Sequence, residues 1–251
     1  MNTSTATMQS ATPALSSAIA GGQSVADISI MGIPGQSGIN GLAGRSGLDG
    51  SNGRNASCNW QSGCISSTGG GNGSNGEAGG NGTDGTNGGD APKVRMYVGS
   101  LTGTIFLASG GGDGGNAGTG GNAGNGGNGG NGGNGDASGA YKAGGSDGGT
   151  GGTGGNGGNG GNGGKAGNGA VITIAYGELV GDSHFVPSTF SSKPGRGGRA
   201  GTAGTGGRGG QGGTQGGKSG AAGTTGMPGT DGKTSTASGA QSSFNIYKGS
   251  L

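Results

Sequence analysis

The hydrophobic positions of this chain are gathered in four short patches, and the long stretches between them carry few apolar side chains. Each patch holds β-branched or aromatic residues in partial alternation with polar ones, a pattern typical of β-strands. The sequence therefore predicts strands over residues 25–31, 93–109, 170–180 and 241–247. The pattern stops after residue 180, so residues 181–194 are expected to form a loop.

Between the patches, glycine occupies every third position, most regularly over residues 112–133. Asparagine commonly fills a second position of each triplet, and the third is often glycine again. Three residues per turn is the repeat of the polyproline II conformation, so each tract is predicted to form a polyglycine-II helix with two sides that carry only hydrogen. The tracts cover residues 32–53, 70–88, 112–133, 149–167, 195–216 and 217–232.

A single tract of this kind is not expected to be stable, because it forms no internal hydrogen bond and ordering its backbone costs about 1 to 2 kcal/mol per residue. Several tracts side by side can bond to one another through their backbones. The predicted fold is therefore a bundle of about six antiparallel polyglycine-II helices, with short β-strands at one end and almost no α-helix. A disordered chain is the alternative that such a composition leaves open.

The strand-like patches recur at regular intervals, and each interval holds two glycine tracts separated by an insert. This spacing indicates an internal repeat. The predicted organisation is a domain over residues 25–251 built from three repeats, at residues 25–92, 93–169 and 170–247.

Residues 1–24 contain no period-three glycine and are expected to form an extended arm. Leu15, Ile19 and Val25 are the candidate subunit contacts, because an extended segment with spaced apolar side chains can add to an open sheet edge of another copy. The alternative is a frayed chain end. The first basic residue is Arg45 and no continuous apolar core precedes it, so the arm is not a convincing secretory signal.

Composition excludes several classes of protein. Of the 251 residues 79 are glycine and 25% are hydrophobic, which is too little apolar side chain for an ordinary core. Only 6 prolines argue against a collagen triple helix. A net charge of +2 calls for no nucleic-acid partner, and no apolar run reaches the length of a membrane span.

The sequence contains no convincing catalytic, metal or cofactor motif. Residues 212–219 match a phosphate-binding loop pattern, but glycine-rich sequence lies on both sides instead of a strand and a helix. His184 is the only histidine and adjoins Asp182 and Ser183, and neighbours on a loop cannot aim at one another as a catalytic triad does. We therefore expect a protein that is not an enzyme.

Two inserts between tracts carry the unusual side chains. Cys58 and Cys64 are the only cysteines, and their separation suits a small disulfide-closed loop. Trp60 within that loop and Tyr141 in the next insert are candidate partner contacts, since exposed aromatic residues anchor protein and sugar partners. Local packing over the end of the bundle is an equally good interpretation.

The tract at residues 114–135, GGNAGTGGNAGNGGNGGNGGNG, resembles the polyglycine-II proteins, namely springtail antifreeze proteins and the tip adhesins of T-even-like phage tail fibres. It is also similar to Gly/Asn-rich regions of bacterial surface proteins. We expect a structural brick that self-assembles into, or caps, an extracellular or virion fibre, with copies of itself or another fibre protein as partners. The alternatives are a receptor-binding tip adhesin, whose partner is a cell-surface receptor, and an ice-binding protein.

Overall fold

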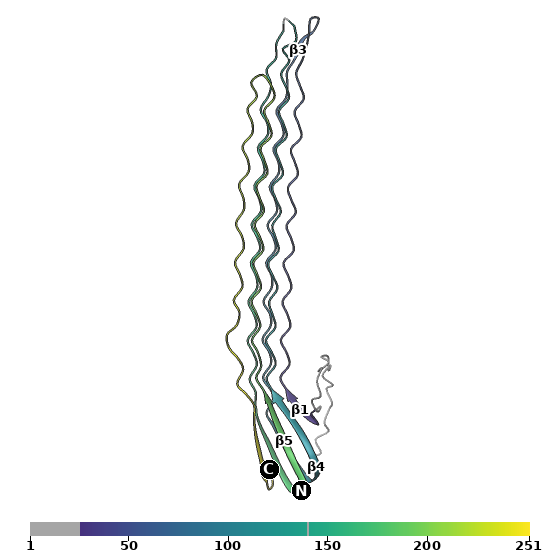
Figure 1. Cartoon of the computed structure of the whole chain (residues 1–251), viewed down its shortest axis with the longest axis vertical. Helices are drawn as coiled ribbons and strands as arrows, with labels where there is room; N and C mark the ends of the chain where they lie inside the picture. The colour runs from purple at the N-terminus through teal and green to yellow at the C-terminus, as the bar shows by residue number, and fades with distance from the viewer. Residues whose placement is uncertain (1–25, 140) are drawn as a thin grey trace, which may run out of the picture.

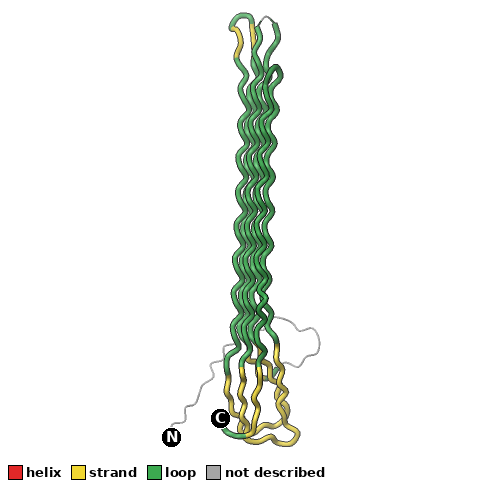
Figure 2. Tube along the Cα trace, turned by 90° about the vertical axis from the view of Figure 1, so that its left-hand side faces the viewer, coloured by secondary structure: helices red, strands yellow, loops and turns green. Residues whose placement is uncertain are grey.

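The structure is a computed structural model that describes residues 26–139 and 141–251, and these residues form one long, narrow rod (Figures 1 and 2). Strands gather at one end, which we call the base, and short loops close the other end, which we call the tip. Glycine tracts connect the two ends. The predicted arm and its candidate contacts Leu15, Ile19 and Val25 lie outside the described residues.

The base holds a four-stranded parallel sheet in the order β1-β4-β5-β6. Its strands are β1 (Ile28–Met31), β4 (Val94–Gly110), β5 (Val171–Phe190) and β6 (Ser243–Lys248). β1 pairs with the last four residues of β4, and β6 pairs with the first six residues of β5. β4 and β5 pair with each other over almost their whole length.

β4 and β5 each turn back on themselves at the base, which Figure 2 shows as bends in the yellow trace. Gly103 and Gly181 have φ of 90° and 63°, a left-handed conformation that glycine adopts without strain. The pairing register shifts between Thr102 and Thr104, next to the first of these glycines. Each strand therefore has one limb that arrives from a glycine tract and a second limb that leads into the next tract.

A small apolar core forms where the strands leave and rejoin the tracts. Ile172 and Ile174 in β5 are fully buried, and Leu107 in β4 is 1% exposed. Ile30 of β1 is buried in the same cluster, and β6 contributes partly buried apolar residues that pack against it. Along β5, the buried Ile172 and Ile174 alternate with the more exposed Val171 and Thr173, as expected where successive side chains of a strand point to opposite faces.

Six glycine tracts run between base and tip in the described part of the chain. Consecutive tracts are antiparallel, as in the bonds Gly71 N to Ser51 O and Ser74 N to Leu48 O. Alternate tracts are parallel and also bonded, so odd and even tracts form two layers of three. We number them tract 1 (32–53), tract 2 (70–89), tract 3 (111–135), tract 4 (145–169), tract 5 (195–213) and tract 6 (217–239).

Asparagine and aspartate side chains bond across the two outer faces of the rod. The Asn40 Oδ1 atom accepts a hydrogen bond of 2.9 Å from the Thr119 backbone N–H in the parallel neighbouring tract. The Asn122 Oδ1 atom accepts one of 3.0 Å from Thr202 N–H in the next tract. Where the outward residue of a triplet is asparagine or aspartate, it thus supplies an acceptor for a backbone donor of the neighbouring tract that has no carbonyl opposite it.

The prediction of a polyglycine-II helix bundle with short strands at one end is wrong. The described residues contain no helix, and their regular secondary structure is the four-stranded parallel sheet plus a small antiparallel sheet. The regular structure comes instead from the sheet, whose parallel pairing joins β1, β4, β5 and β6 across the chain. The strands are also longer than expected, because β4 and β5 span 17 and 20 residues.

Two further expectations need correction. Residues 181–194, predicted as a loop, are mostly strand, since β5 continues to Phe190. The sequence there alternates poorly, but the β4 backbone beside it supplies a complete set of pairing partners from Thr104 to Gly110. Strands also occur at the tip, where β2 (Ser57–Asn59) and β3 (Gly63–Ile65) pair antiparallel. The neighbouring chain at each place, and not the local pattern, decides the conformation.

Candidate functional site at the tip of the rod

The β2–β3 hairpin at the tip differs most from a plain loop between two tracts. Cys58 and Cys64 lie opposite each other in the pairing register and form a disulfide, as the cysteine spacing indicates. Between them, the Asn59 Oδ1 atom accepts hydrogen bonds from the backbone N–H groups of Gln61 (3.0 Å) and Ser62 (2.7 Å). The disulfide and this side-chain turn hold the short loop in one shape.

Asp136 fastens a second loop to this hairpin. Its Oδ2 atom accepts a 2.8 Å hydrogen bond from the Cys58 backbone N–H, and its Oδ1 atom accepts bonds from the Ser138 backbone (2.8 Å) and hydroxyl (2.5 Å). These donors, led by the Ser138 hydroxyl, lower the pKa of Asp136 below its ordinary value. Asp136 is half-buried, and as a carboxylate it can accept all three bonds at neutral pH.

The two aromatic residues singled out by the sequence lie on the same hollow between these loops. Trp60 is 80% exposed and Tyr141 is 50% exposed, and both line a cavity of about 340 Å³. Its other lining residues are Cys58, Asn59, Ser138 and Gly139. Exposed aromatic rings beside hydroxyl and amide groups suit stacking on a sugar or on an apolar side chain. That they contact a partner stays a prediction.

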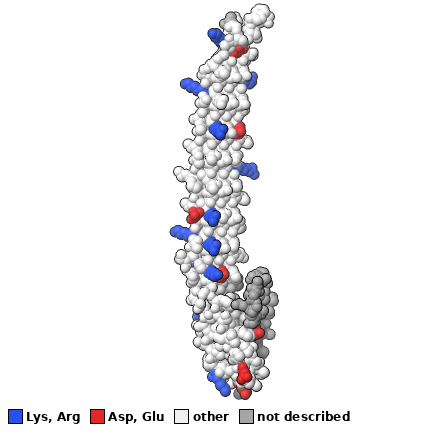
Figure 3. Space-filling model, viewed as in Figure 1, with Lys and Arg blue, Asp and Glu red and all other residues white. Residues whose placement is uncertain are grey.

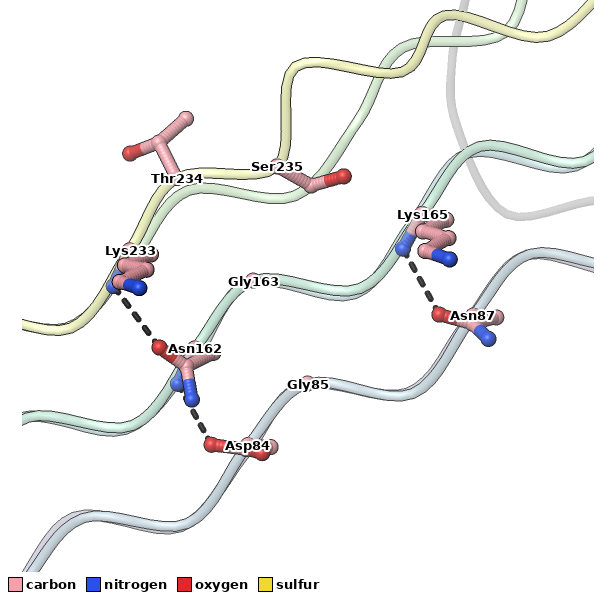
Figure 4. A pocket seen from close by; sticks show the side chains of 9 residues that line it. All are labelled: Asp84, Gly85, Asn87, Asn162, Gly163, Lys165, Lys233, Thr234 and Ser235. Carbon is pink, nitrogen blue, oxygen red and sulfur yellow. Dashed lines mark hydrogen bonds between the residues drawn. The ribbon is translucent and has the colours of Figure 1, made fainter.

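A second hollow, of about 360 Å³, lies on the outer face formed by the even tracts (Figure 4). Backbone-to-side-chain bonds cross it, from Asn162 N–H to Asp84 Oδ1 and from Lys233 N–H to Asn162 Oδ1. The register of tract 6 against tract 4 changes by one residue past Lys233, which widens the space between them. Its two exposed lysines are single charges on an open surface and define no specific ligand.

The remaining sequence candidates do not come together as a site. His184 lies in β5 opposite Thr104, and its Nδ1 atom is 2.9 Å from the Asp182 carbonyl oxygen. Within the described residues no cluster of potential metal ligands occurs, and no helix is long and apolar enough to cross a membrane. On the face in Figure 3, basic and acidic side chains are spread along the rod, and several basic ones lie beside acidic ones.

Sequence reasoning missed Asp136, the residue that joins the two tip loops. It follows directly after the last glycine of tract 3, at the position that glycine fills at every third residue from Gly112 to Gly133. That break in the triplet pattern is the available signal, but it does not reveal a partner 78 residues away. Ser67, which bonds to Ser146 Oγ at 2.7 Å and fastens the inserts together, gives no sequence signal at all.

Comparisons with known proteins assign no family to the chain. No family model matches it, and no curated protein is similar to it. Among solved structures, it is similar to a springtail antifreeze protein from Granisotoma rainieri, described as a nine polyproline type II helical bundle whose crystal waters match the ice lattice. The identity is 22%, over 82% of this chain and 95% of that one, with a TM-score of 0.13. So low a TM-score supports no argument about fold or function.

Proposed function

We propose that this chain is a non-enzymatic structural protein, a rigid rod that builds or caps an extracellular or virion fibre. The observation that carries the proposal is the continuous cross-bonding of the tracts. Each turn of the central tracts 3 and 4 bonds to four neighbouring tracts, so the rod resists bending along its whole length. A chain in which most residues form a stiff connection between two ends is suited to a mechanical role.

The base offers an attachment surface for such a role. β1 and β6 each have one edge that pairs with no described strand, and the second limb of β5, from His184 to Phe190, pairs with β4 along one edge only. Open strand edges readily accept an extended segment from another chain. The partners proposed for the base are a copy of this protein or another fibre protein.

Electron microscopy of the purified full-length protein tests the proposal. We expect filaments, or rods attached end-on to a fibre protein, and we expect a variant that lacks residues 1–24 to remain folded but unattached. Circular dichroism monitors folding of both proteins. Discrete rods of the full-length protein that never associate, with or without a candidate fibre protein, would contradict a fibre role.

The aromatic hollow at the tip favours a second candidate function, a receptor-binding adhesin at the end of a fibre. Trp60 and Tyr141 come from inserts in different repeats and nevertheless line one cavity. Replacing both by alanine is expected to abolish binding to a receptor-bearing cell surface. Met227→Ala is the matched control, because Met227 is 73% exposed but lies in tract 6 on the shaft of the rod. Equal binding by the double variant would remove the adhesin hypothesis.

A further inference from the structure

The edge of the rod that tracts 1 and 2 form carries a line of exposed aliphatic side chains. Ile33, Ile39, Leu42 and Leu48 all occupy the same position of the triplet in tract 1, and they are 80%, 74%, 83% and 78% exposed. Figure 1 shows tract 1, in purple, at one side of the rod with no other tract beyond it. We call this line the aliphatic stripe. A row of four exposed aliphatic side chains is unusual in a chain of which only 25% is hydrophobic.

The glycines of tract 3 show which way the stripe points. The equivalent position in tract 3 is always glycine, because a Cβ atom at Gly112 would lie 2.1 Å from the Ile33 carbonyl oxygen in tract 1. The same holds at Gly118 against Ile39 and at Gly121 against Leu42. Side chains at this position therefore point toward the preceding tract, and in tract 1 they point out of the rod. Their bulk prevents a further glycine tract from packing against this edge.

Side chains of tract 2 complete the edge by bonding to backbone donors of tract 1. The Thr86 Oγ1 atom accepts a 2.7 Å hydrogen bond from Gln36 N–H, and the Ser74 Oγ atom accepts one of 2.7 Å from Leu48 N–H. A partner consequently finds few free backbone donors here with which to extend a sheet. It has to pack against side chains instead.

The pattern of apolar and polar residues along this edge of tract 1 is the same in both directions. Read at every third position from 33 to 48, it is Ile, Gln, Ile, Leu, Arg, Leu. Reversal about its midpoint sets Ile33 on Leu48, Gln36 on Arg45 and Ile39 on Leu42, always apolar on apolar and polar on polar. We propose that this edge is the contact surface of an antiparallel dimer of the chain.

Symmetry explains why the second copy runs antiparallel. A twofold axis across the tracts, lying in the contact plane, stacks tract 1 on tract 1 and tract 2 on tract 2. An axis along the tracts would instead stack the aliphatic stripe on the small and polar side chains of tract 2, which are Ser74, Glu77, Thr83 and Thr86. Only the antiparallel arrangement overlaps both edges fully and joins the two stripes.

The charges of the edge agree with the same arrangement. Glu77 lies level with Arg45, because its Oε2 atom accepts a 3.3 Å hydrogen bond from the Arg45 backbone N–H. Thr86 lies level with Gln36 in the same way. Reversal therefore sets Arg45 of one copy opposite Gln36 of the other, and Glu77 opposite Thr86. No like charges meet, so the contact carries no electrostatic penalty.

The size of the stripe sets the expected strength of the dimer. Fifteen residues of extended chain span at most roughly 50 Å. Two adjacent tracts present a strip roughly 10 Å wide, so the contact covers about 500 Å² per copy, below the roughly 800 Å² of a standard interface. We therefore expect a concentration-dependent dimer with a Kd in the micromolar range.

Sedimentation of the full-length protein measures this association. We expect a monomer–dimer equilibrium that Ile39→Asn with Leu42→Asn weakens about 100-fold, since four buried aliphatic side chains per dimer are lost. The fold should tolerate both changes, because the side chains are exposed and asparagine is common on this rod. Met227→Asn, an exposed apolar residue on tract 6, is the matched control and should leave the Kd unchanged.

Cysteine cross-linking tests the direction. Oxidation of an equal mixture of Ile33→Cys and Leu48→Cys chains should give a mixed dimer, whereas Leu48→Cys alone should give little, because the native cysteines are already paired. Efficient cross-linking of Leu48→Cys to itself would mean a parallel dimer and overturn the proposal. A monomer at about 100 µM would also overturn it. If the monomer dimerises only after removal of residues 1–25, that segment covers the stripe instead.

This inference deepens the proposed fibre role by naming one contact between copies, but its test does not depend on that role. Filaments that form equally well with Ile39→Asn and Leu42→Asn would leave the fibre role intact and reject the dimer as its basis. A dimer without filaments would have the opposite meaning.

Discussion

Substitution of Gly124 by alanine gives the sharpest test of how the rod is packed. A Cβ atom there would lie 1.8 Å from the Arg45 carbonyl oxygen and 2.2 Å from its carbonyl carbon, while real Cβ contacts below 3.0 Å are essentially absent from proteins. Tracts 1 and 3 would have to separate locally by roughly 1.2 Å. Alanine is the smallest possible probe, so the effect is one of backbone separation and not of side-chain size.

The hydrogen bonds around Gly124 give the magnitude. Gly124 N–H donates to Glu77 O at 2.9 Å, and Gly44 and Gly47 of tract 1 donate to Asn122 O (2.8 Å) and Asn125 O (2.7 Å). A separation of more than 1 Å stretches such bonds beyond the useful range. The loss of two or three of them, at roughly 0.5 to 1.5 kcal/mol each, predicts a destabilisation of about 2 to 4 kcal/mol.

Gly126→Ala is the matched control in the same tract. An ideal Cβ at Gly126 would also lie close to backbone, 2.0 Å from Gly152 O. Its row, however, already contains Ala117 and Ala123, whose N–H groups keep normal 2.9 Å bonds to tract 5. Residues of this row are half-buried, whereas the Gly124 row is buried, so the tracts can adjust here. We expect a loss of less than about 1 kcal/mol.

Urea unfolding followed by circular dichroism compares the two variants with the unaltered protein. A large loss at Gly124 and a small one at Gly126 would support the packing described above. Equal losses would refute the distinction between the two rows, and no loss at either position would show that the tracts are not packed in this way.

Three further predictions concern the tip and the arm. Asp136→Ala should loosen the aromatic hollow and change Trp60 fluorescence without changing the unfolding midpoint of the rod. The pKa of Asp136 in the folded protein is lowered, so the carboxylate stabilises the tip fully at any pH above the ordinary pKa of 3.8. This stabilisation is lost only as the pH falls through the lowered pKa, and the Trp60 fluorescence of the unaltered protein should therefore stay constant down to about pH 4. Reduction of the Cys58–Cys64 disulfide should leave the melting temperature of the rod nearly unchanged, since so short a loop constrains little of the chain, and a large drop would contradict this. Deletion of residues 1–24 should leave a cooperatively unfolding protein, and loss of cooperative melting would show that the arm belongs to the fold.

The sequence by itself determined where the chain changes character. Apolar, β-branched patches located most ends of the base strands to within a few residues, because the strand pattern depends on local alternation. Glycine at every third position located the tracts, since a tract without side chains on two faces is useful only where other backbones lie close. Cysteine spacing gave the disulfide, which requires nothing beyond a short, closable loop.

Only the tertiary structure decided how these parts act on one another. The fold class was predicted wrongly, because the four-stranded parallel sheet joins strands whose paired residues, such as Thr104 and His184, lie about 80 residues apart and no local pattern names them. The continuation of β5 to Phe190 depends on β4 beside it. The outward direction of Ile33 and its row follows from tract 1 being at an edge, whereas the equivalent row of tract 3 must be glycine. Neighbours in space, absent from any local window of sequence, fixed each of these features.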